Sequence, residues 1–221
     1  MFTKFTSSIR TGLCLTMLVP LVLGGCGQAV SAQSNDRAEF AKEYDGTQEY
    51  VENTVVWPVA DNFVVHNTTY DELLEKPDGD YYVLFSAEWC FFCQLTNGIL
   101  SKAAADSNKE VYYINEATSP RSSYTIIDGK VIPYVKNDSE TAFINKYGEE
   151  NFETETVEGR NGEVFNHPTI KYPTLFHVSN GKIERLQMPS MVEVARDGLT
   201  ENEAQGIYKE YYDFFLSNTR R

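Results

Sequence analysis

The feature that most restricts the fold is an apolar strand pattern followed at once by two closely spaced cysteines. Residues 81–86 are aromatic, β-branched or aliphatic up to the closing serine, which predicts a buried strand. Apolar residues then recur at helical spacing, namely Leu95, Ile99, Leu100 and Ala103. The pattern therefore predicts a strand leading into an amphipathic helix that starts at Cys90 and Cys93.

This position at the start of a helix favours a reactive thiol. Unpaired backbone N–H groups and the positive end of the helix dipole stabilise a thiolate, which is the form that attacks a disulfide. Cys90 is therefore the candidate nucleophile. Cys93, one turn further along, is the candidate resolving thiol.

Two motifs together resemble the thioredoxin superfamily. The first is Ala87-Glu88-Trp89-Cys90-x-x-Cys93 after a strand, and the second is Tyr172-Pro173-Thr174 at the start of a later apolar strand. The resemblance implies an α/β fold, a thioredoxin-like three-layer α/β/α sandwich around a central mixed sheet. It also implies a redox-active disulfide between Cys90 and Cys93.

The same resemblance assigns roles around the dithiol. Pro173 would be a cis-proline packed against the cysteines, and with Tyr172 it would shape the groove in which an extended substrate docks. Trp89, Phe91 and Phe92 would flank the dithiol, with Trp89 as an apolar wall or as plain packing.

Two departures from the family pattern leave the redox direction open. Leu84 stands where that family commonly carries a buried acid, so a proton acceptor for Cys93 is not evident. The dipeptide Phe91-Phe92 is neither the Gly-Pro associated with reductases nor a His-containing pair associated with strong oxidants. Uncharged rings stabilise a thiolate weakly and Glu88 would oppose one, so we expect a less depressed nucleophile pKa than in strong oxidants.

The first residues have the pattern of a targeting segment. Lys4 and Arg10 precede an apolar stretch, 12–25, that is too short to span a bilayer in the usual way. It ends in Leu23-Gly24-Gly25-Cys26, which resembles the lipobox of bacterial lipoproteins. We predict a signal peptide over 1–25, lipidation of Cys26, and attachment to the extracytoplasmic face of the cell membrane; the alternative is an ordinary secretory signal with an incidental cysteine.

Cysteine count and net charge support this interpretation. The chain has four cysteines, and removal of Cys14 with acylation of Cys26 leaves Cys90 and Cys93 as its free thiols. The formal net charge of −13 argues against nucleic acid and against electrostatic binding to anionic lipid. Attachment to the membrane would then depend on the lipid.

The mature chain divides into a tether and one domain. Small, polar and charged residues predict a flexible tether over 26–49, with a short helix near 38–44, and a thioredoxin-like domain over 50–218. Within the domain the sequence predicts an edge strand near 63–65, a capped helix from Thr69, a strand over 111–115, a hairpin turning at Asn180-Gly181 and a final capped helix from Thr200.

The stretch of about 116–170 interrupts this regular pattern. Turn signals alternate there with short β-branched runs and one predicted helix over 139–147. We interpret it as a large insertion before the strand that Pro173 opens. It is either a surface elaboration or a rim that selects partners.

Three other uses of the cysteines are less well supported. A structural zinc site would need His66, His167 or His177, none of which has the spacing of a zinc knuckle to the cysteines. A purely structural disulfide would close too short a loop to stabilise much, and a cysteine–histidine hydrolase would need His177 beside Cys90.

The sequence thus predicts a membrane-anchored extracytoplasmic thiol-disulfide oxidoreductase. It would act on exported cysteine-containing proteins and be reset by a membrane redox partner, with no organic cofactor and no metal, since the dithiol itself carries the electrons. The alternative is a thioredoxin-like accessory or binding module, for example of a peptide-export system, in which the insertion carries the function.

Overall fold

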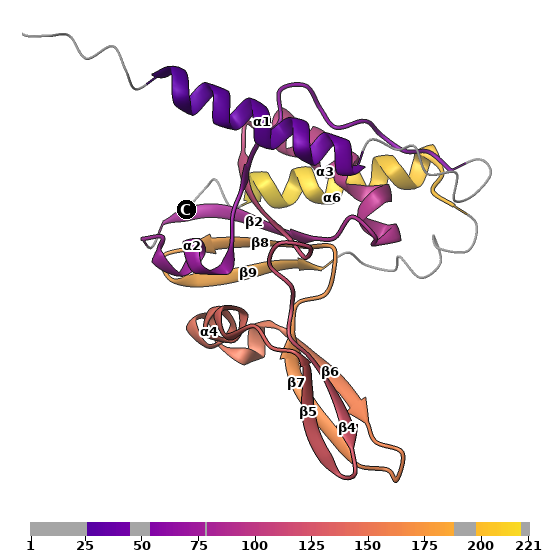
Figure 1. Cartoon of the computed structure of the whole chain (residues 1–221). Coiled ribbons are helices and arrows are strands. Elements are labelled where there is room, and N and C mark those ends of the chain that lie inside the picture. Colours follow the sequence, from indigo (N-terminus) through magenta and orange to yellow (C-terminus); the bar gives the residue numbers. More distant parts are fainter. Residues whose placement is uncertain (1–25, 45–53, 78, 188–197, 218–221) are drawn as a thin grey trace, which may run out of the picture.

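A mixed five-stranded sheet forms the centre of the molecule (Figure 1). The computed structural model describes residues 26–44, 54–77, 79–187 and 198–217. The strands lie in the order β1 (Val64–Asn67), β3 (Glu110–Asn115), β2 (Asp80–Ser86), β8 (Thr174–Ser179) and β9 (Lys182–Gln187). The first three are parallel, whereas β8 runs antiparallel to β2 and β9 antiparallel to β8.

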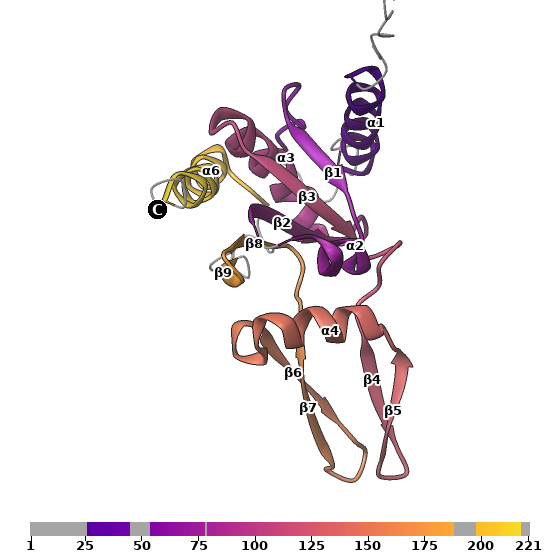
Figure 2. The same cartoon turned by 90° about the vertical axis from the view of Figure 1, so that its left-hand side faces the viewer.

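Helices cover both faces of this sheet, as Figure 2 shows. One face carries α1 (Cys26–Tyr44), α3 (Phe91–Asp106) and α6 (Glu201–Ser217), and the other carries α2 (Tyr70–Glu75) and α4 (Asp138–Tyr147). Side chains of β2 alternate between the two layers, Tyr82 and Leu84 toward the first and Val83 and Phe85 toward the second. The predicted mixed α/β architecture is confirmed at this level.

Most elements predicted from local pattern are present. The strand over 81–86, the helix that begins at the cysteines and the strand over 111–115 correspond to β2, α3 and β3. Thr69 and Glu72 form both hydrogen bonds of the predicted capping box, and Thr200 exchanges the same pair with Glu203. None of the described helices is long and apolar enough to cross a bilayer.

The short helix predicted near 38–44 is present, but the flexible tether predicted around it is wrong for the residues up to Tyr44. Residues 26–44 form the continuous helix α1, and its Phe40 and Tyr44 are 0% exposed in the core. Phe40 packs against Phe63 and Tyr113 at ring-centroid distances of 5.4 and 5.0 Å. Polar contacts add to this packing, since Arg37 donates to the Ala60 carbonyl at 3.0 Å and to the Asp61 carboxylate at 2.8 Å. The predicted signal segment and tether residues 45–49 lie outside the described residues.

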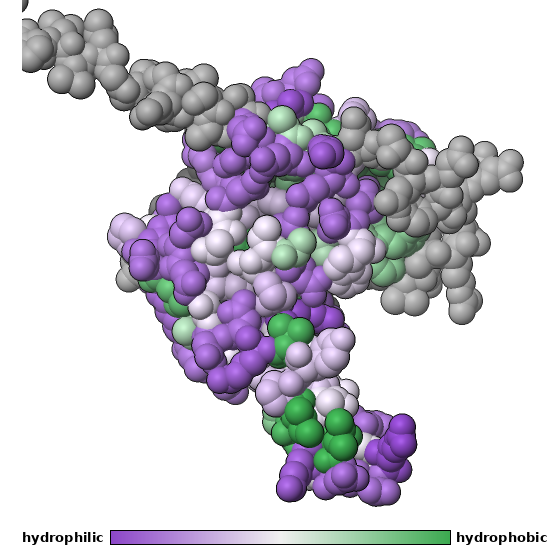
Figure 3. Space-filling model, in the orientation of Figure 1, coloured by the Kyte–Doolittle hydropathy of each residue, from purple (hydrophilic) through white to green (hydrophobic). Residues whose placement is uncertain are grey.

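The insertion forms part of the core and also two projecting hairpins. Helix α4, predicted over 139–147, buries Phe143 and Ile144 against the sheet, and a short 3₁₀ turn, η1 (Glu149–Asn151), follows it. The hairpins pair β4 (Ser123–Ile127) with β5 (Lys130–Val135) and β6 (Glu153–Glu158) with β7 (Val164–Thr169). They extend away from the sheet, and Figure 3 shows hydrophobic atoms on them.

Gly98 allows helix α3 to lie close to the segment before β1. A Cβ atom at Gly98 would lie 1.8 Å from the backbone oxygen of Trp57, so no side chain fits there. In contrast, Gly206 of α6 has no atom within 4 Å of its Cβ position.

Replacing Phe40 with Ala should lower the free energy of unfolding by about 3–5 kcal/mol, because a large buried ring is removed. Replacing the exposed Lys42 with Ala should change it by less than about 0.5 kcal/mol. Urea unfolding of both variants measures this. Equal stability of the two would mean that α1 is a tether after all.

The two helical glycines should respond in opposite directions to alanine. Gly98→Ala should destabilise the protein by at least about 2 kcal/mol, since α3 would have to move away from Trp57. Gly206→Ala should stabilise it by about 1 kcal/mol through helix propensity alone. Thermal unfolding of both variants checks the sign, and stabilisation by both would contradict the close approach at Gly98.

Candidate functional site

The two cysteines lie where β2 gives way to α3. Cys90 is the N-cap of α3, and its sulfur accepts a hydrogen bond from the backbone N–H of Cys93 at 3.4 Å. The backbone N–H of Cys90 donates to the carbonyl of Ala87 at 3.1 Å, which closes the turn that leaves the strand. Both cysteines are thiols in this structure, so the disulfide that the resemblance implies stays a prediction.

The segment before β8 closes over this turn. The Tyr172–Pro173 peptide bond is cis, and the carbonyl oxygen of Tyr172 lies 3.7 Å from the Cys90 sulfur. Pro173 is buried, and Trp89 stands beside Tyr172 with ring centroids 6.3 Å apart. The structure therefore brings together the residues that the two sequence motifs singled out.

The surroundings move the pKa values of the two thiols in opposite directions. The pKa of Cys90 is lowered, first by a hydrogen bond from the Cys93 thiol and also by backbone N–H groups, against the opposing effects of burial and of Glu116. Burial raises the pKa of Cys93 well above its ordinary value, and the hydrogen bond to Cys90 adds to this. Cys90 is thus the group that ionises first. The carboxylate that opposes ionisation of Cys90 is that of Glu116, whereas the sequence had suggested Glu88.

An open groove of about 590 Å³ runs beside Cys90. Trp89, which is 61% exposed, stands at the groove with Phe91 and Phe92. The insertion supplies the opposite side through residues 154–156 of β6 and through Arg121, whose guanidinium lies 5.6 Å from the centre of the Tyr172 ring. An extended chain that reached Cys90 would therefore contact the insertion as well.

Sequence reasoning missed a chain of polar groups behind Cys93. The Ser86 hydroxyl lowers the pKa of the Cys93 thiol by hydrogen bonding, and it lies 3.0 Å from the Tyr44 hydroxyl. The Tyr44 hydroxyl in turn lies 2.8 Å from that of Tyr113, which donates to the Glu43 carboxylate at 2.6 Å. The repeat of aromatic residues at Phe40 and Tyr44 was the one sequence signal that this segment is buried.

The histidines lie elsewhere. His177 lies 2.7 Å from Asp80 at the start of β2, at the end of the strand away from the cysteines, so it does not orient Cys90. His66 is paired with Glu110, and His167 stacks on Phe165 in the β6–β7 hairpin. Within the described ranges, no three His, Cys, Asp or Glu side chains are grouped so as to hold a metal ion.

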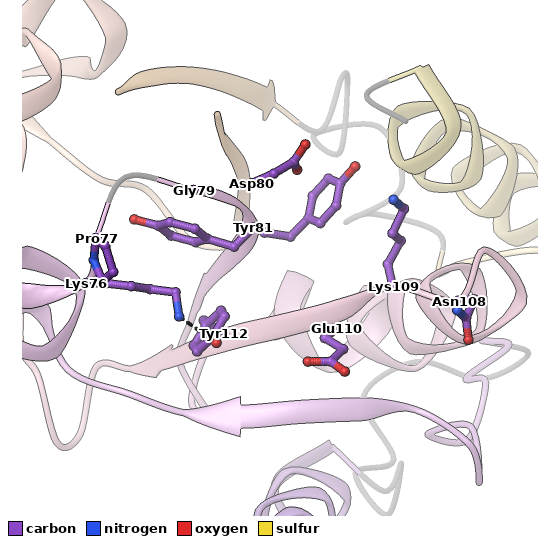
Figure 4. A pocket seen from close by; sticks show the side chains of 10 residues that line it. Lys76, Pro77, Gly79, Asp80, Tyr81, Asn108, Lys109, Glu110 and Tyr112 are labelled. Carbon is purple, nitrogen blue, oxygen red and sulfur yellow. Dashed lines mark hydrogen bonds between the residues drawn. The ribbon is translucent and has the colours of Figure 1, made fainter. Parts of the chain in front are cut away.

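A second hollow, of about 570 Å³, lies at the end of the sheet where β2 begins (Figure 4). Lys76 donates to the Tyr112 hydroxyl there at 2.7 Å and lies over its ring. Lys109 and Glu110 come from the start of β3. The hollow is lined by lysines, carboxylates and tyrosines rather than by a thiol, and its charges are of both signs.

Comparison with known proteins does not assign this chain to a family. No protein-family model matches this chain, and no curated protein matches it at a significant level.

The lowered pKa of Cys90 should depend on the thiol of Cys93. In a chain whose Cys14 and Cys26 are replaced by Ser, the first thiolate should form below the pH at which an ordinary thiol ionises. Cys93→Ala should move this titration to higher pH because the hydrogen-bond donor is lost, whereas Cys93→Ser should keep most of the effect. Ultraviolet absorbance of the thiolate measures it, and identical titrations of the two variants would contradict the assignment.

Proposed function

We propose that this protein is a thiol-disulfide oxidoreductase with a thioredoxin-like fold, anchored by lipid at Cys26 to the extracytoplasmic face of a bacterial membrane. The observation that carries the proposal is the pairing of a low-pKa thiol at a helix N-terminus with a buried second thiol, beside a groove at the cis Tyr172–Pro173 bond. A sheet of three parallel strands followed by two that alternate in direction also fits a thioredoxin-like domain.

The chemistry follows from the geometry. The Cys90 thiolate attacks one sulfur of a partner's disulfide, and the partner's other sulfur leaves as a thiolate. Cys93, once deprotonated, attacks the Cys90 sulfur of this mixed disulfide and releases the partner's second thiolate. The partner gains two electrons and the Cys90–Cys93 pair becomes a disulfide. The reverse sequence oxidises a partner, and a membrane redox protein would reset the pair.

The groove supports a partner in extended conformation. The carbonyl of Tyr172 faces Cys90 from one side, and Trp89 offers an exposed apolar surface at the same place. Exported proteins with cysteines supply such segments whenever a disulfide lies in a loop or in an unfolded chain. Neither a metal nor an organic cofactor is needed for this exchange.

The accessory-module alternative has one observation in its favour. The β4–β5 hairpin exposes apolar side chains, with Tyr134 84% exposed and Ile127, Val131 and Ile132 also accessible. Exposed apolar groups at a projecting hairpin suit contact with another protein. In this alternative the cysteines would be dispensable.

Cys93→Ala separates the two functions. In cells, the lipid-anchored Cys93→Ala chain should accumulate disulfide-linked complexes with exported proteins, because Cys90 still attacks and nothing resolves the mixed disulfide. Non-reducing electrophoresis followed by a reducing second dimension reveals them. The matched control is the double variant Cys90→Ala/Cys93→Ala, which should form none. Absence of complexes in the single variant would overturn the oxidoreductase function.

An equilibrium titration in graded thiol–disulfide buffers then assigns the direction. A potential of about −270 mV would place the pair with reductases, and one of about −120 mV would place it with oxidants of exported proteins. A pair that does not exchange reversibly would favour the accessory module.

A further inference from the structure

The buried position of Cys93 creates a chemical requirement. Cys93 is 0% exposed and its pKa is raised, yet it must lose its proton before it can attack the mixed disulfide. Leu84, on the strand that precedes the cysteines, offers no acceptor. The side chain that lowers the pKa of the Cys93 thiol by hydrogen bonding is Ser86, which is itself buried.

The hydroxyl of Ser86 is the first of three that lead away from Cys93. It lies 3.0 Å from the Tyr44 hydroxyl, which lies 2.8 Å from the Tyr113 hydroxyl. Tyr113 reaches the Oε2 atom of Glu43 at 2.6 Å. Glu43 is partly exposed near the end of α1, so the chain of hydroxyls connects a sulfur with no exposure to a carboxylate near the surface.

Hydrogen bonds from two asparagines restrict the hydroxyl protons to two possible arrangements. Asn97 donates its amide to the Ser86 oxygen at 2.8 Å, so the Ser86 proton is directed either to Tyr44 or to Cys93. At the far end Asn115 donates to the Oε1 atom of Glu43 at 2.8 Å, which leaves Oε2 for Tyr113. Each hydroxyl has one proton, so all of them point toward Glu43 or all point toward Cys93.

We propose that Glu43 is the proton acceptor for Cys93 and that Tyr113, Tyr44 and Ser86 relay the proton between them. This inference rests on the oxidoreductase function proposed above. In this proposal helix α1 takes part in the resolving step. Its Glu43 supplies the proton acceptor that Leu84 on β2 does not provide.

The relay conserves every atom. In the mixed disulfide Cys90 is no longer a thiolate, so the Cys93 thiol is free to donate to Ser86, and the hydroxyls point toward an ionised Glu43. Each group then passes its own proton one place along, from sulfur to Ser86, from Ser86 to Tyr44, from Tyr44 to Tyr113, and from Tyr113 to the Oε2 atom of Glu43. The Cys93 thiolate so formed attacks Cys90, and the partner leaves with the electron pair of the broken S–S bond. No oxidant beyond the partner's disulfide is consumed.

The charged and titratable groups around both ends fit this role. Burial raises the pKa of Glu43, and the carboxylates of Glu88 and Glu39 raise it further, against hydrogen bonds from Tyr113 and Asn115 that lower it. A carboxylate of raised pKa is a better proton acceptor than an ordinary one. The Glu43 backbone carbonyl also accepts a hydrogen bond from Gln94 of α3 at 3.0 Å, which ties the end of α1 to the active-site helix.

Around Cys93, the neighbouring titratable groups are Cys90, Tyr44, Tyr172 and Tyr211. Burial is the main cause that raises the pKa of each of these tyrosines. Burial likewise raises the pKa of Tyr113. The relay tyrosines therefore stay protonated at neutral pH and transfer protons without ionising on their own.

Glu43→Gln tests the relay in a single turnover. The full chain, carrying Cys14→Ser and Cys26→Ser in a mild detergent, is reduced and mixed with an aromatic disulfide that releases a coloured thiol. Attack by Cys90 releases the first equivalent, and resolution by Cys93 releases the second. We expect Glu43→Gln to leave the first release unchanged and to slow the second at least about tenfold at neutral pH.

The pH profile distinguishes a proton acceptor from a merely structural residue. In the unmodified site the second release should reach a plateau once Glu43 is ionised. In Glu43→Gln it should keep rising about tenfold per pH unit, because Cys93 then loses its proton to solvent. The two rates should converge at high pH. A ratio that does not change with pH, or no slowing at all, would overturn the relay.

Three variants complete the test. Tyr44→Phe and Tyr113→Phe break the relay without changing a charge and should reproduce the pH profile of Glu43→Gln; a profile like that of the unmodified site in both would overturn the relay. Glu75→Gln, at an exposed glutamate of α2, is the matched control and should behave like the unmodified site. If the unmodified site itself gives no second release, the oxidoreductase function fails and the relay with it.

Discussion

Burial of β2 on both faces fixes the point at which the chain leaves the sheet and begins α3. Its side chains alternate between two helical layers up to Ser86, and the turn that follows delivers Cys90 to the first position of the helix. Helix N-terminal donors and the thiol of Cys93 then stabilise a thiolate on Cys90. The same covering layers leave Cys93 without exposure, so one constraint produces both the reactive and the unreactive thiol.

A polar chain through this core is costly unless every member has a partner. Tyr44, Tyr113 and Ser86 lie among apolar neighbours, and each makes at least two hydrogen bonds within the chain. Such networks are stabilising when satisfied and hold their side chains in one arrangement. The oxygen of the Asn97 amide has no partner among the described residues, whereas its nitrogen holds Ser86. The network is thus almost completely satisfied although it crosses the packed interior.

Local signals were enough to predict much of the fold. Strand β2, the capping boxes at Thr69 and Thr200 and the turn at Asn180-Gly181 are set by residues near one another in sequence, and all are present. The docking of α1 was not predicted, because polar composition outweighed two aromatic side chains whose partners lie far along the chain. The Tyr44 hydroxyl meets Ser86 and Tyr113 across separations of 42 and 69 residues. Single-sequence patterns do not show such contacts, so the proton acceptor proposed for Cys93 could not be found from the sequence.

Helix α1 begins at Cys26 and continues without a break to the residues that enter the core. A helix of 19 residues rises about 28 Å. In the lipid-anchored form proposed above, a rigid helix rather than a flexible linker would connect the lipid anchor to the sheet. Cys90 would then stay within a narrow range of distances from the membrane surface. The distance of a partner's disulfide from the membrane, as well as its sequence, would therefore decide whether Cys90 reacts with it.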